Sequence, residues 1–91
     1  ARAIDLDPTG ASYMKRGQLH AADGRLAAAL EDYDEAINSE GAEEAYYWRA
    51  IVNEREGETL LAAGDLRLFL QNVTPDHPLA SAAKAKLSEL K

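Results

Sequence analysis

The chain has 91 residues, of which 46 % are hydrophobic, with no cysteine and a formal net charge of −6. This length suits one small domain, and the hydrophobic share is typical of a folded chain. The lack of cysteine excludes disulfides and thiolate chemistry. The acidic balance, with basic residues scattered along the chain, predicts no nucleic-acid partner and no docking on an anionic membrane. No signal-peptide pattern or apolar run of about 20 residues is present, so we expect a soluble chain of unknown compartment.

The first half of the chain predicts helices separated by short turns. Residues 1–8 look like the end of a helix followed by a turn. A helix is expected over residues 11–22, and it ends near Gly24, which can adopt the left-handed conformation that closes a helix. The next helix has an apolar stripe at spacings of three, four and seven residues, with acidic residues on its other sides. The stripe comprises Leu26, Ala29, Leu30, Tyr33, Ala36 and Ile37, and the acidic residues are Glu31, Asp32, Asp34 and Glu35.

The second half predicts the same cycle and one further helix. A helix is expected over residues 43–56, ended by Gly57, and its partner has apolar residues at Leu60, Ala62, Ala63, Leu66, Phe69 and Leu70. Gly64 within this partner costs about 1 kcal/mol relative to Ala, which predicts a close approach of another backbone. A last helix is expected from Pro78 to about Leu90, with Asp76 as its N-cap. No segment alternates with a period of two, so we expect an all-α fold of antiparallel neighbouring helices.

Several positions recur at a fixed spacing of 33 residues. Tyr13, Arg16, Gly17, Gly24, Ala29 and Asp32 recur as Tyr46, Arg49, Ala50, Gly57, Ala62 and Asp65. A period of this size is typical of stacked repeat proteins, in which one helical unit is copied along the chain. Such stacks serve mainly as binding surfaces, so the period favours a binding role over a catalytic one.

These recurring residues resemble the tetratricopeptide repeat, an α-solenoid unit of about 34 residues. The resemblance implies one domain over residues 1–91, made of the end of a preceding repeat (1–8), repeats at 10–41 and 43–72, and a capping helix (76–91). Tyr46 takes the place of the core aromatic in the second repeat. Arg16 and Arg49 depart from the pattern, because they stand where the family usually has Leu. Phe69 replaces a small residue, which hints at altered packing against the last helix.

The resemblance also implies a binding site, because tetratricopeptide arrays bind a peptide in the concave groove lined by the first helix of each pair. The corresponding positions here are Met14, Lys15, Gln18, Tyr47, Trp48, Ile51 and Arg55. Large aromatics are enriched at binding hot spots, which favours Trp48 as a contact. Tyr47 has two open interpretations, as a binding residue or as an internal packing residue.

The expected ligand is a protein or peptide of apolar or mixed character. Some family members grip the C-terminal carboxylate of heat-shock chaperones through a clamp of Lys, Asn and Arg. At the corresponding positions only Lys15 is basic, so the clamp is absent here. The alternative is a self-association or docking module, in which the aromatic patch meets a second copy or a neighbouring domain of a larger protein.

An enzyme is not expected from this sequence. His20 and His77 are far apart and lack ligand spacing, which predicts no metal site. His77 beside Pro78 is better explained as helix-start chemistry. Acidic pairs such as Asp32 and Asp34 are two residues apart and diverge on a helix, so they do not form an acid–base pair. The glycines are solitary, so no phosphate-binding loop is present, and we predict no catalytic residue and no cofactor.

Overall fold

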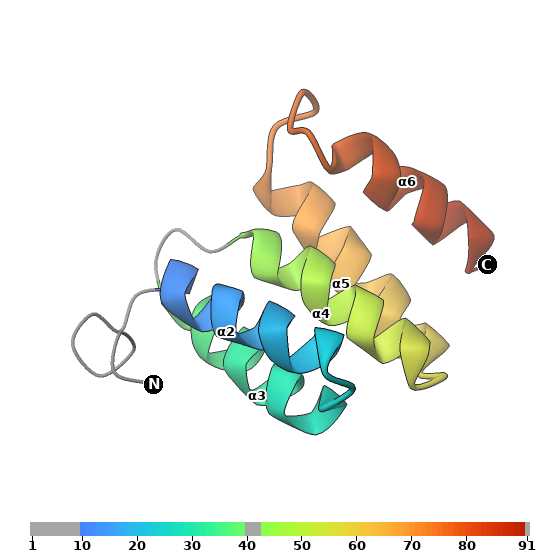
Figure 1. The fold of residues 1–91 in the computed structure, drawn as a ribbon. Helices are drawn as coiled ribbons and strands as arrows, with labels where there is room; N and C mark the ends of the chain where they lie inside the picture. The colour runs from blue at the N-terminus through green and yellow to red at the C-terminus, as the bar shows by residue number, and fades with distance from the viewer. Residues whose placement is uncertain (1–9, 40–42, 91) are drawn as a thin grey trace.

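The computed structural model describes residues 10–39 and 43–90, and over these ranges it has five helices and no strand. The expected remnant at residues 1–8 lies outside the described residues. The helices, with the labels of Figure 1, are α2 (Gly10–Ala22), α3 (Leu26–Ile37), α4 (Glu44–Arg55), α5 (Thr59–Asn72) and α6 (Ala80–Glu89). None of these helices is long and apolar enough to span a membrane. The all-α prediction is confirmed.

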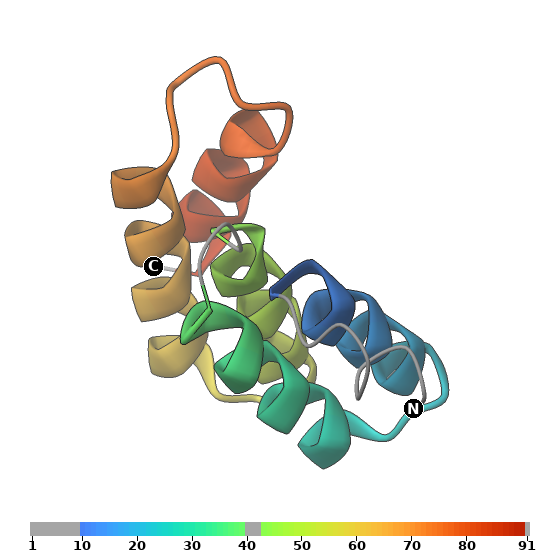
Figure 2. The ribbon, with the colours of Figure 1, turned by 90° about the vertical axis from the view of Figure 1, so that its left-hand side faces the viewer.

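The helices are arranged in two layers. α2 pairs with α3 and α4 pairs with α5, and the two pairs stack side by side, while α6 covers the far end of the second pair (Figure 1). Turning the molecule by 90° shows α3 and α5 in one layer and α2 and α4 in the other (Figure 2). We call the exposed side of α2, α4 and α6 the inner face, and the exposed side of α3 and α5 the outer face.

Two glycines make the tight turns within the helix pairs. Gly24 has a φ of 81° and Gly57 a φ of 80°, values that an L side chain rarely adopts. In both turns the chain closes with the same backbone hydrogen bond, from Arg25 N to the carbonyl of His20 and from Glu58 N to the carbonyl of Asn53, each 2.8 Å long. These closures confirm the helix ends that the sequence predicted at Gly24 and Gly57.

The core runs continuously through both pairs and ends under α6. Ala29, Tyr33 and Val52 join the first pair to the second, and Leu66 and Phe69 continue the core beneath α6. The Phe69 ring contacts two other rings, those of Tyr47 and of His77, which lies just before α6. It lies 5.6 Å from the Tyr47 ring and meets the His77 ring edge-on at 5.2 Å.

Gly17 lies where the Tyr33 ring of α3 packs directly against the backbone of α2. A Cβ added at this position would lie 2.7 Å from Cε1 of the Tyr33 ring, which is closer than real carbon atoms pack. The Tyr33 side chain is fully buried, so the ring has little room to move away. A residue without a side chain is therefore needed where the large ring crosses α2.

Leu60, the first apolar residue expected in α5, is 88 % exposed. Three expectations about individual residues are wrong. Asp32, placed by the helical pattern on an acidic side away from the apolar stripe, is not solvated but buried, and it pairs with Arg16. Asp76 does not cap α6, which begins at Ala80 and has no side-chain cap. Gly64 meets no neighbouring atom within 4 Å of an added Cβ, so the described chain makes no close approach there.

Candidate partner-binding face

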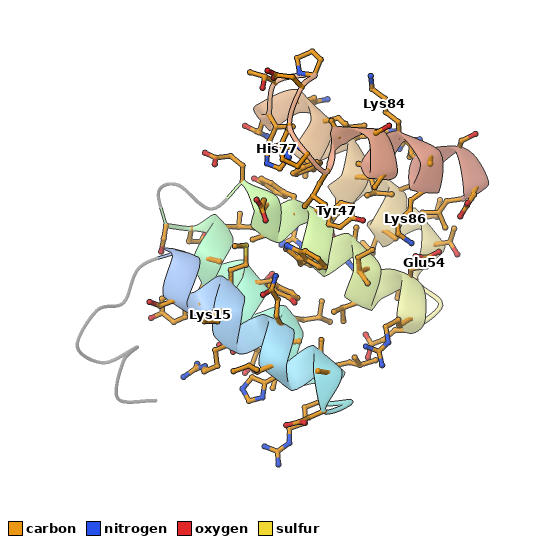
Figure 3. The ribbon with its side chains drawn as sticks, turned by 45° about the horizontal axis from the view of Figure 1, so that its top comes forward. Lys15, Tyr47, Glu54, His77, Lys84 and Lys86 are labelled. Atoms are coloured by element: carbon orange, nitrogen blue, oxygen red, sulfur yellow. The ribbon has the colours of Figure 1, made fainter. Side chains whose placement is uncertain are left out.

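The predicted site residues lie on α2 and α4, the first helices of the two pairs. Lys15 is exposed on α2, and Gln18, one turn further on, is half-buried. Met14 is also half-buried, because it packs against the clusters that join the two pairs. Figure 3 shows Lys15 on α2 and Tyr47 on α4, with Glu54 of α4 beside Lys86 of α6. Met14, Lys15 and Gln18 therefore all lie on α2, and of these three Lys15 is the exposed one.

Trp48 lies at the junction of the two repeats. Its side chain is half-buried and packs against the core clusters of both helix pairs. The indole meets the Tyr47 ring edge-on at 5.0 Å, and its Nε1–H donates to a carboxylate oxygen of Glu44 at 3.4 Å. The polar handle of the indole is thus held by a residue one turn away, which fixes the ring in one orientation.

Tyr47, and not Tyr46, supplies the core aromatic of the second repeat. The Tyr47 side chain is 6 % exposed and packs between Phe69 and Trp48, where Figure 3 places it beneath α6. Tyr46 is half-buried, and its ring has the Arg49 guanidinium 5.7 Å above it. The expectation that Tyr46 fills the core is wrong by one position, because α6 covers the side of α4 on which Tyr47 lies. Of the two interpretations of Tyr47, the structure favours internal packing.

The last two predicted residues lie further along α4. Ile51 is half-buried and packs against the second core cluster. Arg55 is exposed, and its guanidinium donates to the carbonyl of Ala21 at 3.0 Å, which ties the end of α4 to the end of α2. Part of the hydrogen-bonding capacity of Arg55 is therefore already used within the chain, whereas Ile51 adds apolar surface next to Trp48.

Polar contacts between α4 and the α6 segment were missed by the sequence analysis. Lys86 Nζ lies 3.3 Å from a carboxylate oxygen of Glu54, and His77 Nε2 lies 3.5 Å from Glu44. His77 Nδ1 accepts a hydrogen bond from the Leu79 backbone N–H at 3.0 Å, just before α6 begins, as its helix-start interpretation requires. The repeat pattern of the sequence does not pair these residues.

Two ion pairs hold the helices of each repeat together at equivalent places. In the first repeat, Arg16 donates twice to Asp32, at 2.9 and 2.7 Å. In the second, Arg49 donates twice to Asp65, at 3.0 and 2.6 Å. The departures from the family pattern at Arg16 and Arg49 are thereby explained, because each replaces an apolar contact with a bidentate one.

The Arg49–Asp65 ion pair makes further hydrogen bonds to neighbouring side chains. Asp65 also accepts from Asn53 at 2.9 Å, and Arg49 reaches Asp34 of the first repeat at 2.8 Å. The hydrogen bond to Asp65 is the main cause of the raised pKa of Arg49, so this guanidinium is firmly charged. Burial, followed by the nearby Asp32 charge, raises the pKa of Tyr33 to about 12. The buried carboxylates hold the helices of each pair together.

Comparison with known proteins supports the fold assignment. The chain is 37 % identical over 71 residues to the tetratricopeptide repeat and J domain-containing co-chaperone DNJ1 of Cryptococcus neoformans var. grubii. The described residues form two stacked antiparallel helix pairs, and equivalent positions of the pairs recur with a period of 33 residues. The chain belongs to the tetratricopeptide-repeat family. Membership supports a general role in protein interaction.

The match covers different shares of the two proteins. The match covers 76 % of this chain, and the chain spans only 14 % of the length of the relative. No family model matches the chain, and no solved structure matches it. The likeness therefore concerns only a small part of the relative.

Proposed function

We propose that this chain is a non-catalytic interaction module that binds a segment of a partner protein on its inner face. The observation that carries the proposal is Trp48, which lies half-buried between two repeats with its indole fixed by Glu44 and Tyr47. A rigid aromatic at the centre of a surface loses little conformational entropy when a partner covers it. Met14 on α2 and Ile51 on α4 are also half-buried and extend the apolar surface around Trp48.

The chemistry of the inner face points to an apolar or mixed segment. Lys15 is exposed beside the apolar residues and suits a carboxylate on the ligand, while Arg55 is already bonded to Ala21. A ligand that depends on two clamped carboxylates is not favoured, because Lys15 lacks basic neighbours at the clamp positions. The relative is named a co-chaperone, so an extended segment of another protein is the ligand class that we favour.

The bonding of the acidic and imidazole groups supports a non-catalytic role. Asp32 and Asp65 are buried, and each is held by an arginine. His20 lies 3.5 Å from Asp32, and His77 accepts a backbone N–H. Asp32 and Asp65 line hollows of about 490 and 350 Å³, but in both hollows the carboxylate is already engaged by its arginine.

Selection from a phage-displayed library of random peptides would test the proposal. The chain would be immobilised, and an enriched peptide would be synthesised and titrated by isothermal titration calorimetry. We expect Lys15→Glu and Trp48→Phe each to weaken binding at least tenfold. Trp48→Phe keeps an aromatic ring in the core, so the loss would report on the surface contact.

Arg25→Glu provides the matched control. Arg25 is exposed at the turn between α2 and α3, so the same change of charge is made away from the inner face. Binding should be unchanged in this variant. Equal losses for Lys15→Glu and Arg25→Glu would show a general charge effect, and would overturn the assignment of the inner face.

A further inference from the structure

The outer face of α5 carries an exposed apolar stripe that the proposed function does not use. Leu60 is 88 % exposed, Leu61 57 % and Leu68 38 %. Leu60 and Leu68 lie four residues before and four residues after Gly64, so the three positions share one side of the helix. We call Leu60, Leu61, Gly64 and Leu68 the leucine stripe.

Gly64 leaves the backbone of α5 open at the middle of this stripe. No atom of the described chain lies within 4 Å of a Cβ added at Gly64. A glycine inside a helix is unfavourable unless another backbone comes close, and here no part of the described chain does. The stripe therefore presents a shallow notch between two exposed leucines.

The same positions in the first repeat have the opposite character. Thirty-three residues earlier, Leu60, Leu61, Gly64 and Leu68 correspond to Ala27, Ala28, Glu31 and Glu35. Arg67, at the edge of the stripe, likewise corresponds to Asp34. The outer face of α3 thus carries small and acidic residues. At the equivalent positions of α5 none of these carboxylates is kept.

A hollow adjoins the stripe at the seam between α5 and α6. It has a volume of about 220 Å³, and its lining is mainly apolar, from Leu60, Ala63, Leu87 and Leu90, with Thr59 and Arg67 at its edge. Leu60 thus stands between the hollow and the notch at Gly64. A large apolar side chain placed opposite Leu60 would meet both.

We propose that the leucine stripe binds a second copy of this chain, with the two α5 helices crossing antiparallel at Gly64. A two-fold axis through Gly64 sets Leu60 of each copy opposite Leu68 of the other, because both lie four residues from the glycine. Such a patch is self-complementary, as a two-fold interface requires. Leu68 of the second copy then lies at the mouth of the hollow beside Leu60.

Charge supports a second copy as the occupant. The chain has a net charge of −6, so two copies repel each other wherever their carboxylates meet. The leucine stripe has no carboxylate. Arg67 lies at its edge towards α6 and corresponds to Leu61 of the second copy across the axis. At the opposite edge Asp34 and Asp65 lie near Leu61, and both are paired with Arg49. The leucine stripe therefore lets two acidic molecules approach on a surface whose neighbouring carboxylates are already paired.

Sedimentation equilibrium between about 5 µM and 1 mM tests the proposal. A small interface of this kind corresponds to a dissociation constant on the order of 10–100 µM. Leu68→Glu installs the residue of the first repeat, and it should raise that constant at least 30-fold. Leu19→Glu is the matched control, because Leu19 is an exposed leucine of α2, and its dimer should be unchanged.

A cysteine probe locates the axis, since the chain has no cysteine of its own. Gly64→Cys places two thiols together at the crossing, within the roughly 4.4–6.8 Å between Cα atoms that a disulfide spans. Under mild oxidation this variant should cross-link at least tenfold faster than Glu31→Cys, at the equivalent position of α3. A strictly monomeric chain, a dimer that Leu68→Glu leaves intact, or equal cross-linking rates would each overturn the proposal.

Discussion

The two repeats hold their helices together in the same way but differ in the surfaces that they present. Arg16–Asp32 and Arg49–Asp65 are equivalent bidentate pairs 33 residues apart. On the outer face, Glu35 of the first repeat becomes Leu68 of the second. The comparison teaches that positions between helices are constrained by their partners, whereas surface positions are free to acquire different binding properties.

The two repeats also place their large and small core residues differently at one pair of facing positions. In the first repeat Gly17 faces the large ring of Tyr33. The equivalent positions in the second repeat are Ala50 and Leu66, so a larger residue on one helix accompanies a smaller one on the other. Equal packing is therefore reached with different side chains, as dense protein interiors require.

The largest expected effect concerns the two buried carboxylates. Asp65→Ala should lower the free energy of unfolding by about 3 kcal/mol and Asp32→Ala by about 2 kcal/mol, because each change removes the buried partner of a bidentate arginine pair. Asp65 is the costlier loss, since it also accepts from Asn53, and Arg49 is less exposed than Arg16. Urea denaturation at pH 7 measures both values. An equal or larger loss for Asp32→Ala would contradict this ranking of the two repeats.

The different placement of large and small core residues predicts a second effect. Gly17→Ala should destabilise the chain by about 2 kcal/mol, because the new Cβ overlaps the Tyr33 ring. Helix propensity alone would stabilise it by about 1 kcal/mol, so the two explanations have opposite signs.

A double variant sharpens this test. Gly17→Ala combined with Tyr33→Leu gives the first repeat a smaller residue opposite the alanine, as in the second repeat. The combined loss should be at least about 1 kcal/mol smaller than the sum of the single losses. Strictly additive losses in urea denaturation would show that the two positions do not constrain each other.

The smallest expected effect is a pH dependence that belongs to the first repeat, because Leu66 replaces Tyr33 in the second. The pKa of Tyr33 is raised to about 12, so the unfolded chain loses this proton first. The stabilisation is complete below pH 10 and is lost as the pH rises from 10 to 12, by about 1 kcal/mol at pH 11. Urea midpoints of the wild type and Tyr33→Phe at pH 9 and 11 measure it. A variant whose midpoint falls as much as that of the wild type would contradict it.

The sequence predicted the parts of the fold that depend on local pattern. The 33-residue period, the all-α class and the turns at Gly24 and Gly57 follow from residue types at fixed spacings. The Arg–Asp pairs were missed although both members recur at the fixed period, 16 residues apart in each repeat. Charged residues in helices are usually solvated, so their burial depends on tertiary contacts that spacing does not show.

The helix that carries each candidate site residue was predictable from the sequence, but the burial of these residues was not. The period placed Trp48 on a first helix, yet it could not show that α6 covers Tyr47 and leaves Tyr46 at the edge of the core. Leu60 belongs to the run of apolar residues expected in α5, but it is six residues from Leu66 and nine from Phe69. It therefore lies on another side of the helix and is exposed.

Chemical-shift mapping of the ¹⁵N-labelled chain, titrated with the peptide selected from the random library, tests the central claim most directly. The claim is that the repeats share a scaffold, and that the inner face around Trp48 binds the partner. We expect the largest shifts at the Trp48 indole N–H and at the backbone amides of Lys15, Gln18 and Ile51, with α3 and α5 little changed. Shifts concentrated on α3 or α5, with the Trp48 indole unaffected, would contradict the claim.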